Sequence, residues 1–162
     1  MSSYAINSLY TELQVLLKPL LSVPAMHQQW GIGGSVLLLH LGLLTQARDV
    51  DLVCTPESFP ALATLLQASY QPLPVTPHPH YRSCYFARFQ SQQGQVIELM
   101  SGIEVWQTDA VQAWYFEPAL LSWQHGLPWM SAGQWLDLYR LFDRPGRINL
   151  LLDYLLVTAE LS

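Results

Sequence analysis

Hydrophobic residues recur along this chain at two spacings, and the change from one spacing to the other predicts where helices and strands lie. From Ser3 to about Ser22 the apolar positions follow the helical repeat of about 3.6 residues, up to a stop at Pro24. The apolar positions of this repeat are Ile6, Leu9, Leu13, Leu16, Leu17 and Leu20. The first predicted element is therefore an amphipathic helix that lays one face on the core.

A strand, a helix, a second strand and a second helix are predicted next. Trp30 to Ile32 is typical of a short buried strand, and the apolar run from Gly34 to Leu41 predicts a helix. That helix should stop at Gly42, because glycine suits a left-handed C-terminal turn. Alternating apolar and polar residues predict a strand from Arg48 to Val53, and a proline-led turn begins a helix over Thr55 to Ser69.

The middle of the chain predicts a loop followed by a β-hairpin. Gln71 to His80 contains four prolines and two histidines, which favours an extended loop over a regular element. The two histidines could bind a metal, although the lack of a nearby cysteine or third histidine favours exposed residues of a rigid connection. Tyr81 to Phe89 and Gln95 to Met100 are strand-like runs joined by a turn that contains Gly94.

The last part of the chain is aromatic and then helical. Rings between Trp106 and Gln124 could stack on a base or a drug, but core packing is the commoner use of aromatic side chains. Ser131 and Gln134 match a capping box, which predicts that a helix begins there and continues to about Phe142. A final helix is expected over about Arg147 to Thr158.

Taken together, these elements predict an α+β fold in which a mixed β-sheet is packed with helices, followed by a C-terminal helical segment. The expected organisation is an α/β domain over residues 1–130, with the helical segment of residues 131–162 packed on the same core.

Composition narrows the range of functions. Hydrophobic residues make up 51% of the 162 residues and charged residues only 12%. The surface is therefore expected either to be polar through Gln, Ser and Thr or to be partly covered by a partner, as in a homo-oligomer. The formal net charge of −5 argues against general nucleic-acid binding, which needs clustered Lys and Arg, and it suits a small, even cationic, substrate.

The chain also has no feature that predicts secretion or membrane insertion. Cys54 and Cys84 are too few for a disulfide framework or a zinc site, and two reduced cysteines are expected. No signal peptide and no apolar run of about 18 residues occurs, so we expect a cytoplasmic protein with no membrane partner.

The candidate chemistry lies between Trp30 and Val53. Gly33-Gly34-Ser35 forms a turn with little side-chain bulk at a helix start, where unpaired amides and the helix dipole favour an anion such as phosphate, and Ser35 adds a hydroxyl. Asp49 and Asp51 should share one face of their strand, so both carboxylates could reach one divalent ion. Either motif alone is better explained by an ordinary turn or a solvated strand end, whereas the combination favours a phosphate and metal site.

This combination of a Gly-Gly-Ser turn, a helix and an Asp-x-Asp strand resembles the nucleotidyltransferase fold of the DNA polymerase beta superfamily. It is most similar to the small lincosamide and aminoglycoside nucleotidyltransferases of antibiotic resistance, clearly so over Trp30 to Phe59. The resemblance implies that Gly33, Gly34 and Ser35 hold the phosphates of a nucleoside triphosphate, with ATP as the first candidate. It also implies that Asp49, Asp51 and a later acidic residue on a neighbouring strand bind magnesium ions.

Glu98 is the position that matches the third acidic residue of the resembling family. Because it stands between Ile97 and Leu99, its side chain should leave the core on the opposite face of the strand. The resemblance implies that Glu98 completes a second metal site or acts as a base, although Asp is commoner at this position. Glu104 is the rival, and Glu98 is preferred because it follows the hairpin directly and lies in mid-strand.

Three of the six arginines, Arg140, Arg144 and Arg147, lie close together near the C-terminus. Their guanidinium groups could bind a triphosphate, because guanidinium forms paired hydrogen bonds with phosphate oxygens. They could equally pair with nearby aspartates and cap a helix end. The sequence leaves both readings open.

Two functions follow as hypotheses. The first is a metal-dependent transfer of a nucleoside monophosphate from a nucleoside triphosphate to a hydroxyl of a small molecule or protein, with catalysis by Asp49, Asp51 and Glu98. The second is a catalytically inactive nucleotidyltransferase-like module that binds a partner, for instance in a toxin-antitoxin or regulatory pair. The low charge and the aromatic segment suit such a surface, whereas retention of all three acidic positions favours the enzyme.

Overall fold

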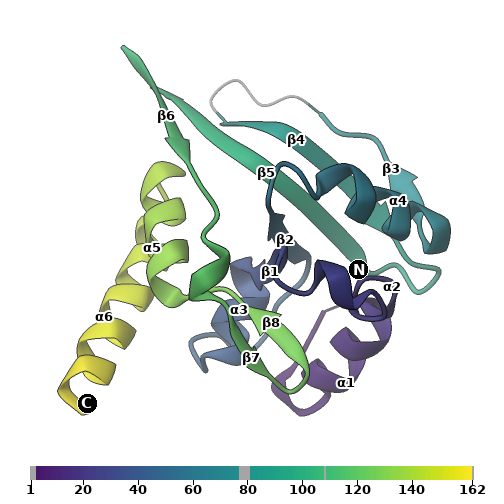
Figure 1. Cartoon of the computed structure of the whole chain (residues 1–162). Helices are drawn as coiled ribbons and strands as arrows, with labels where there is room; N and C mark the ends of the chain where they lie inside the picture. The colour runs from purple at the N-terminus through teal and green to yellow at the C-terminus, as the bar shows by residue number, and fades with distance from the viewer. Residues whose placement is uncertain (1–2, 77–80, 108, 162) are drawn as a thin grey trace.

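A mixed β-sheet of eight strands organises the computed structural model, which describes residues 3–76, 81–107 and 109–161 (Figure 1). The strands are β1 (Trp30–Gly33), β2 (Val50–Cys54), β3 (Gln71–Leu73), β4 (Tyr81–Gln90), β5 (Val96–Gln107), β6 (Ala110–Trp114), β7 (Ser122–Gln124) and β8 (Leu127–Trp129). Their order across the sheet is β3-β4-β5-β2-β1-β8-β7, and β6 pairs with β5 outside this path. The predicted α+β fold with a mixed sheet is therefore confirmed.

The long strand β5 connects the two halves of the sheet. Its first part pairs in parallel with β2, and its far part pairs antiparallel with β6, while β4 runs antiparallel along its other edge. On the far side of β2, β1 is antiparallel to β2 and parallel to β8. The β5–β6 pair extends beyond the rest of the sheet at the upper left of Figure 1.

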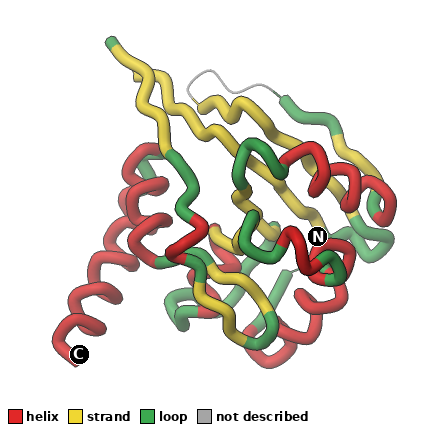
Figure 2. Tube along the Cα trace, in the orientation of Figure 1, coloured by secondary structure: helices red, strands yellow, loops and turns green. Residues whose placement is uncertain are grey.

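Helices cover the sheet and extend from one end of it (Figure 2). They are α1 (Ile6–Leu16), α2 (Lys18–Leu21), α3 (Gly34–His40), α4 (Phe59–Ser69), α5 (Ala132–Leu141) and α6 (Pro145–Leu161), with short 3-10 turns at Pro24–Met26 and Pro118–Leu120. Helix α4 packs on β4 and β5, and α1 packs on α3 and β8. Helix α6 packs on α5, and none of the described helices is both long and apolar enough to cross a bilayer.

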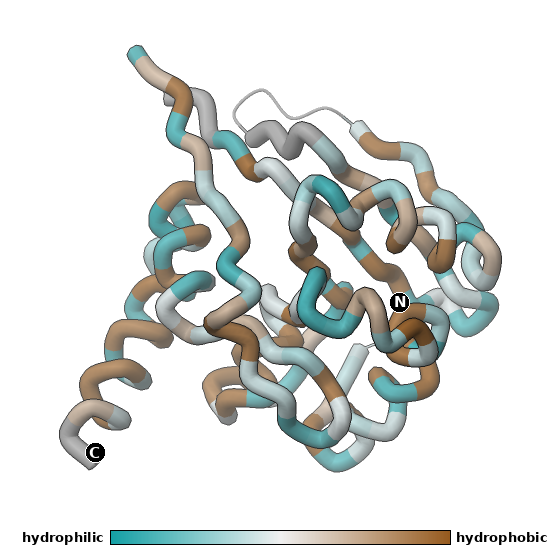
Figure 3. The backbone as a smooth tube through the Cα atoms, in the orientation of Figure 1, coloured by the Kyte–Doolittle hydropathy of each residue, from teal (hydrophilic) through white to brown (hydrophobic). Residues whose placement is uncertain are grey.

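The core forms where the apolar faces of strands and helices meet. Trp30 and Ile32 of β1 and Leu52 of β2 are fully buried together with Leu9 and Leu13 of α1. Figure 3 shows that α6 is hydrophobic along most of its length, and Leu156 and Val157 at its outer part are 63% and 54% exposed.

The predicted N-terminal helix is wrong in extent, because the structure divides it into α1 and α2 at Leu17. Pro19 has no amide hydrogen to bond to a carbonyl of the preceding turn, and proline is tolerated in the first turn of a new helix, which accounts for the break. Before α1, Tyr4 does not join a helix and instead forms an isolated antiparallel bridge with Ala47.

The loop predicted from Gln71 to His80 is also partly wrong. Its first three residues form β3, at the edge of the sheet, where a strand tolerates the missing amide hydrogen of Pro72. The two candidate metal-binding histidines, His78 and His80, lie outside the described residues. At the other end of the chain, α6 begins two residues earlier than predicted, with Pro145 at a position where proline is favoured.

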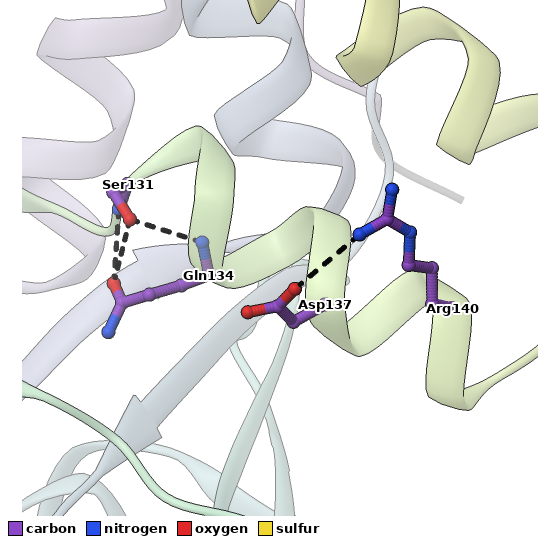
Figure 4. A network of polar contacts seen from close by, with 4 residues as sticks. All are labelled: Ser131, Gln134, Asp137 and Arg140. Atoms are coloured by element: carbon purple, nitrogen blue, oxygen red, sulfur yellow. Dashed lines mark hydrogen bonds and ion pairs between the residues drawn. The ribbon is translucent and has the colours of Figure 1, made fainter.

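Other local predictions are confirmed. Helix α3 ends before Gly42, which adopts a φ of +80°. The capping box at the start of α5 is present, since the Ser131 hydroxyl accepts a hydrogen bond from the Gln134 amide and the Gln134 side chain accepts one from the Ser131 amide (Figure 4). The strand predicted from Arg48, by contrast, begins only at Val50 as β2, so Asp49 lies in the bend just before it.

Candidate functional site

Asp51 and Glu98 are direct neighbours in the centre of the sheet. They are register partners on the parallel strands β2 and β5, so their Cα atoms lie about 4.8 Å apart and their side chains leave the sheet on the same face. Val50 and Leu52 on β2, and Ile97 and Leu99 on β5, are buried on the other face. The alternation of apolar and acidic residues on both strands thus places two carboxylates side by side.

Asp49 adds a third carboxylate to this pair. It is half-buried in the bend before β2, close enough for its charge to affect both neighbours. Burial, followed by the charges of Glu98 and Asp49, raises the pKa of Asp51 well above its usual range. Burial and the charge of Asp49 likewise raise the pKa of Glu98. Negative charge on Asp51 and Glu98 is therefore disfavoured, and a cation bound beside them would relieve the repulsion.

The glycine turn lies directly against this unit. Gly34 adopts a φ of +63°, and a Cβ atom built on it would collide with the carboxylate of Asp51. Gly33 is the register partner of Asp51 on β1, and a Cβ atom there would collide with the indole ring of Trp135 on α5. The two glycines thus let a carboxylate and an aromatic ring approach the backbone, and Ser35 follows them, half-buried, in the first turn of α3.

Arg88 is a member of the site that sequence reasoning missed. It is the register partner of Glu98 on β4, and its Nε atom lies 3.4 Å from Glu98 Oε1. Arg88 opposes the rise in the Glu98 pKa that burial causes. Its position could have been counted from the predicted hairpin, because the turn that pairs Gln90 with Val96 also places Arg88 opposite Glu98.

The junction of α5 and α6 brings further residues toward Asp51. Tyr139 is 6% exposed, and burial, followed by the charge of Asp51, raises its pKa to about 12. The charges of Arg147 and Arg144 lower the pKa of Tyr139, and the charge of Arg144 also lowers the pKa of Asp51. Helix α5 therefore contributes a tyrosine to the site, and the α5–α6 junction contributes positive charge.

Two candidates from the sequence lie elsewhere. Arg140 lies on the surface of α5, where its Nη1 atom is 3.9 Å from Asp137 Oδ1 (Figure 4). It therefore pairs with a nearby aspartate, which is the structural role of the two that the sequence left open. Glu104 is on the far part of β5, opposite Arg82 of β4 and Ala113 of β6, beyond the stretch that pairs with β2. Glu98 is thus the acidic residue of β5 that lies beside Asp51.

Within the described residues, no three His, Cys, Asp or Glu side chains are arranged as ligands of one metal ion. The carboxylate of Glu98 forms an ion pair with Arg88. The donor set nevertheless fits magnesium, which usually binds through one or two protein carboxylates and completes its shell with water and substrate phosphates. Asp49 and Asp51 supply that number.

Comparisons with known proteins give one informative match. No protein-family model and no curated protein sequence matches this chain. Its structure matches a crystal structure from Thermotoga maritima, described as that of a "putative nucleotidyltransferase", with a TM-score of 0.68 over 94% of this chain and 95% of that chain. The chain has a nucleotidyltransferase-like fold.

The nucleotidyltransferase-like fold confirms the coarser part of the resemblance found in the sequence. The two chains are 15% identical, so the likeness concerns the fold and not a particular subfamily. The closer similarity to lincosamide and aminoglycoside nucleotidyltransferases stays a prediction. Asp51, Glu98 and the glycine turn now have a defined place in this fold, at the centre of the sheet.

Proposed function

We propose that this chain is a metal-dependent nucleotidyltransferase, which moves a nucleoside monophosphate from a nucleoside triphosphate to a hydroxyl of a small molecule or protein. The observation that carries the proposal is the placement of Asp51 beside Glu98 on adjacent parallel strands, over the turn at Gly34, within a nucleotidyltransferase-like fold. A purely structural sheet would gain nothing from a buried carboxylate whose pKa is raised by burial and by the neighbouring carboxylates.

In the proposed reaction the acceptor hydroxyl oxygen attacks the α-phosphorus of the triphosphate. The bond from that phosphorus to the bridging oxygen breaks, and pyrophosphate leaves. Glu98 is the candidate acceptor of the hydroxyl proton, because its raised pKa makes it a stronger base than an ordinary carboxylate. Magnesium held by Asp49 and Asp51 would supply charge stabilisation to the triphosphate.

The glycine turn has a supporting part in this proposal. The close approach of Asp51 to Gly34 puts the carboxylates next to the first turn of α3, where Ser35 offers a hydroxyl. A triphosphate bound there would lie within reach of both the hydroxyl and the metal site. ATP is the first nucleotide to test.

The test is transfer of label from a radiolabelled nucleoside triphosphate, in magnesium, to a panel of aminoglycosides, lincosamides and cell extract. Asp51→Asn and Glu98→Gln should each lower transfer by orders of magnitude, because each removes a charge from the site. Glu104→Gln is the matched control, since it makes the same change on the same strand away from β2, and it should leave transfer unchanged. Equal transfer by all four proteins would reject the carboxylate site.

A second function is favoured by one observation, the ion pair of Glu98 with Arg88. A carboxylate neutralised by arginine suits a module that binds a partner without catalysis, and Tyr115, Leu120 and Trp123 are 76%, 47% and 41% exposed in the aromatic segment. This alternative expects no transfer by the unsubstituted protein to any acceptor. It also expects partner binding that survives Asp51→Asn.

A further inference from the structure

An open pocket of about 530 Å³ lies where α5 passes into α6. Its lining combines Leu44, from the loop between α3 and β2, with residues of the α5–α6 junction: Arg144, Pro145, Gly146, Arg147 and Leu150. Both charged residues of this lining are arginines. We call this site the arginine pocket.

The two guanidinium groups of the arginine pocket are available to a ligand. Neither Arg144 nor Arg147 forms an ion pair with a described carboxylate, in contrast to Arg140, which reaches Asp137. The Nη1 atom of Arg147 is buried and has no hydrogen-bond partner among the described residues. A buried donor without a partner costs free energy, which an arriving acceptor would recover.

The start of α6 adds donors at the same place. The amide of Ile148 bonds to the carbonyl of Arg144, so the amides of Gly146 and Arg147 precede the first hydrogen bond of the helix. Helix α6 is 17 residues long, and its N-terminal end carries the positive end of the helix dipole. Two guanidinium groups and two amides around one pocket form a binding site for an oxyanion.

Arg144 links the arginine pocket electrostatically to the carboxylates. Arg144 acts electrostatically on both Asp51 and Tyr139, and Tyr139 is influenced by Arg147 as well. Leu44 belongs to the loop that leads directly to Asp49 and β2. A ligand in the arginine pocket would therefore reach the carboxylates from the side of α6, whereas the glycine turn at the start of α3 lies against them on the side of β1.

We propose that the arginine pocket binds a phosphoryl group of a substrate, with Arg144 and Arg147 as its ligands. This inference rests on the proposed function. It assigns a chemical class to the substrate, which would carry an anionic group near the carboxylates. The phosphoryl group belongs either to the end of the triphosphate or to the acceptor.

Binding of inorganic pyrophosphate, in EDTA so that no metal contributes, tests the pocket directly by calorimetry. Arg144→Gln and Arg147→Gln should each weaken pyrophosphate binding roughly tenfold or more, the effect of losing a hydrogen bond to a charged group. Arg140→Gln is the matched control, because Arg140 is three residues past Asp137 on an exposed face of α5, and it should bind pyrophosphate as the unsubstituted protein does. Circular dichroism checks that each variant is folded.

A methylene analogue of ATP distinguishes the two sources of the phosphoryl group. If Arg144→Gln weakens binding of the analogue and of pyrophosphate equally, the pocket holds the triphosphate. If only pyrophosphate binding falls, the pocket holds an anion of the acceptor. Equal pyrophosphate affinity in all four proteins, or no saturable binding, overturns the inference. The pyrophosphate measurement does not depend on nucleotidyl transfer, so the two proposals can fail separately. Arginine-dependent pyrophosphate binding without nucleotidyl transfer would reject only the proposed function. Transfer that depends on Asp51, without such binding, would reject only the arginine pocket.

Discussion

Asp51 is held in surroundings that disfavour its charge. It has Glu98 beside it on β5, Asp49 two residues before it and Gly34 against its carboxylate, and Arg144 is the cation that acts in its favour. A carboxyl group whose pKa is raised by folding destabilises the native state wherever it must ionise. The environment of Asp51 therefore lowers the free energy of unfolding of the protein.

We predict that Asp51→Asn raises the free energy of unfolding at pH 7 without divalent ions, by roughly 1 kcal/mol, the ordinary scale of a single substitution. The folded-state pKa of Asp51 is raised, so the native state loses nothing while both states are protonated, below about pH 4. The loss develops as the pH rises through the folded pKa. Urea unfolding at several pH values should show that the free energy of unfolding of Asp51→Asn exceeds that of the unsubstituted protein by an amount that grows from pH 4 to pH 7. Asp153→Asn, at an exposed position on α6, should show no such growth.

Ser35 is the residue that best tests the phosphate role of the glycine turn. A substitution at Gly34 would strain a φ of +63° and push away Asp51, so it would damage the carboxylates as well. We predict that Ser35→Ala weakens magnesium-dependent binding of ATP by roughly three- to tenfold, the value of one hydrogen bond. Calorimetry measures it, with Ser8→Ala on the exposed face of α1 as the control. Unchanged affinity would remove the Ser35 hydroxyl from the site.

The sequence predicts the positions of Asp51 and Glu98 because strand alternation is a local property. Arg88 could have been predicted with the same rule, by counting across the hairpin. Tyr139 and Arg144 could not, because their place depends on how α5 docks beside Gly33, and no local pattern encodes that docking. Arg140 and Arg144, four residues apart on one segment, have different roles for the same reason.

At the scale of elements, α5 has a well-defined start. The Ser131 hydroxyl and the Gln134 side chain each satisfy an amide that the helix itself leaves unpaired, and Gln134 is only 5% exposed. This turn precedes Trp135, the ring that covers Gly33. The cap therefore fixes the position of α5 over the sheet.

We predict that Ser131→Ala lowers the free energy of unfolding by about 1 kcal/mol, the usual effect of losing an N-cap. Urea unfolding followed by tryptophan fluorescence measures the change. Ser122→Ala, at an exposed position on the edge strand β7, is the control. A loss no greater than that of the control would show that the cap is not needed.

Sequence patterns predict elements well where the signal lies within the element. The Gly42 stop and the capping box of α5 are such signals. Strands β3 and β8 were missed because proline weakens their pattern, and pairing with a neighbouring strand overrides that preference. The strand β5 is longer than predicted, because β6 supplies partners for its far part.

At the scale of the whole molecule, the C-terminal helices complete the core. Trp135, Leu136, Leu138 and Tyr139 of α5 and Leu151 of α6 are buried in the same cluster as the strands. Losing a large buried side chain costs about 3 to 5 kcal/mol, and a domain is stable by only about 5 to 15 kcal/mol. The sheet is therefore not expected to stand without α5.

We predict that a fragment of residues 1–130 does not unfold cooperatively in urea, whereas the full chain does. Loss of α5 would expose the strand backbone at Gly33 and the buried faces beside it. A chain shortened at Leu155, which keeps α5 and the buried Leu151, is the control and should retain a cooperative transition. A sharp transition in the 1–130 fragment would show that the C-terminal helices form a separate unit.

The two adjoining glycines have a consequence for divergence among relatives of this chain. Gly33 is required by Trp135 and Gly34 by Asp51, so each is retained by a steric partner whether or not a nucleotide binds. A descendant that had lost its chemistry would keep Gly33 for as long as Trp135 covered it. Replacement of Asp51 by a smaller residue would remove the steric constraint on Gly34, although its φ of +63° would still favour glycine or asparagine. In such a lineage Asp51 should therefore be replaced before Gly34.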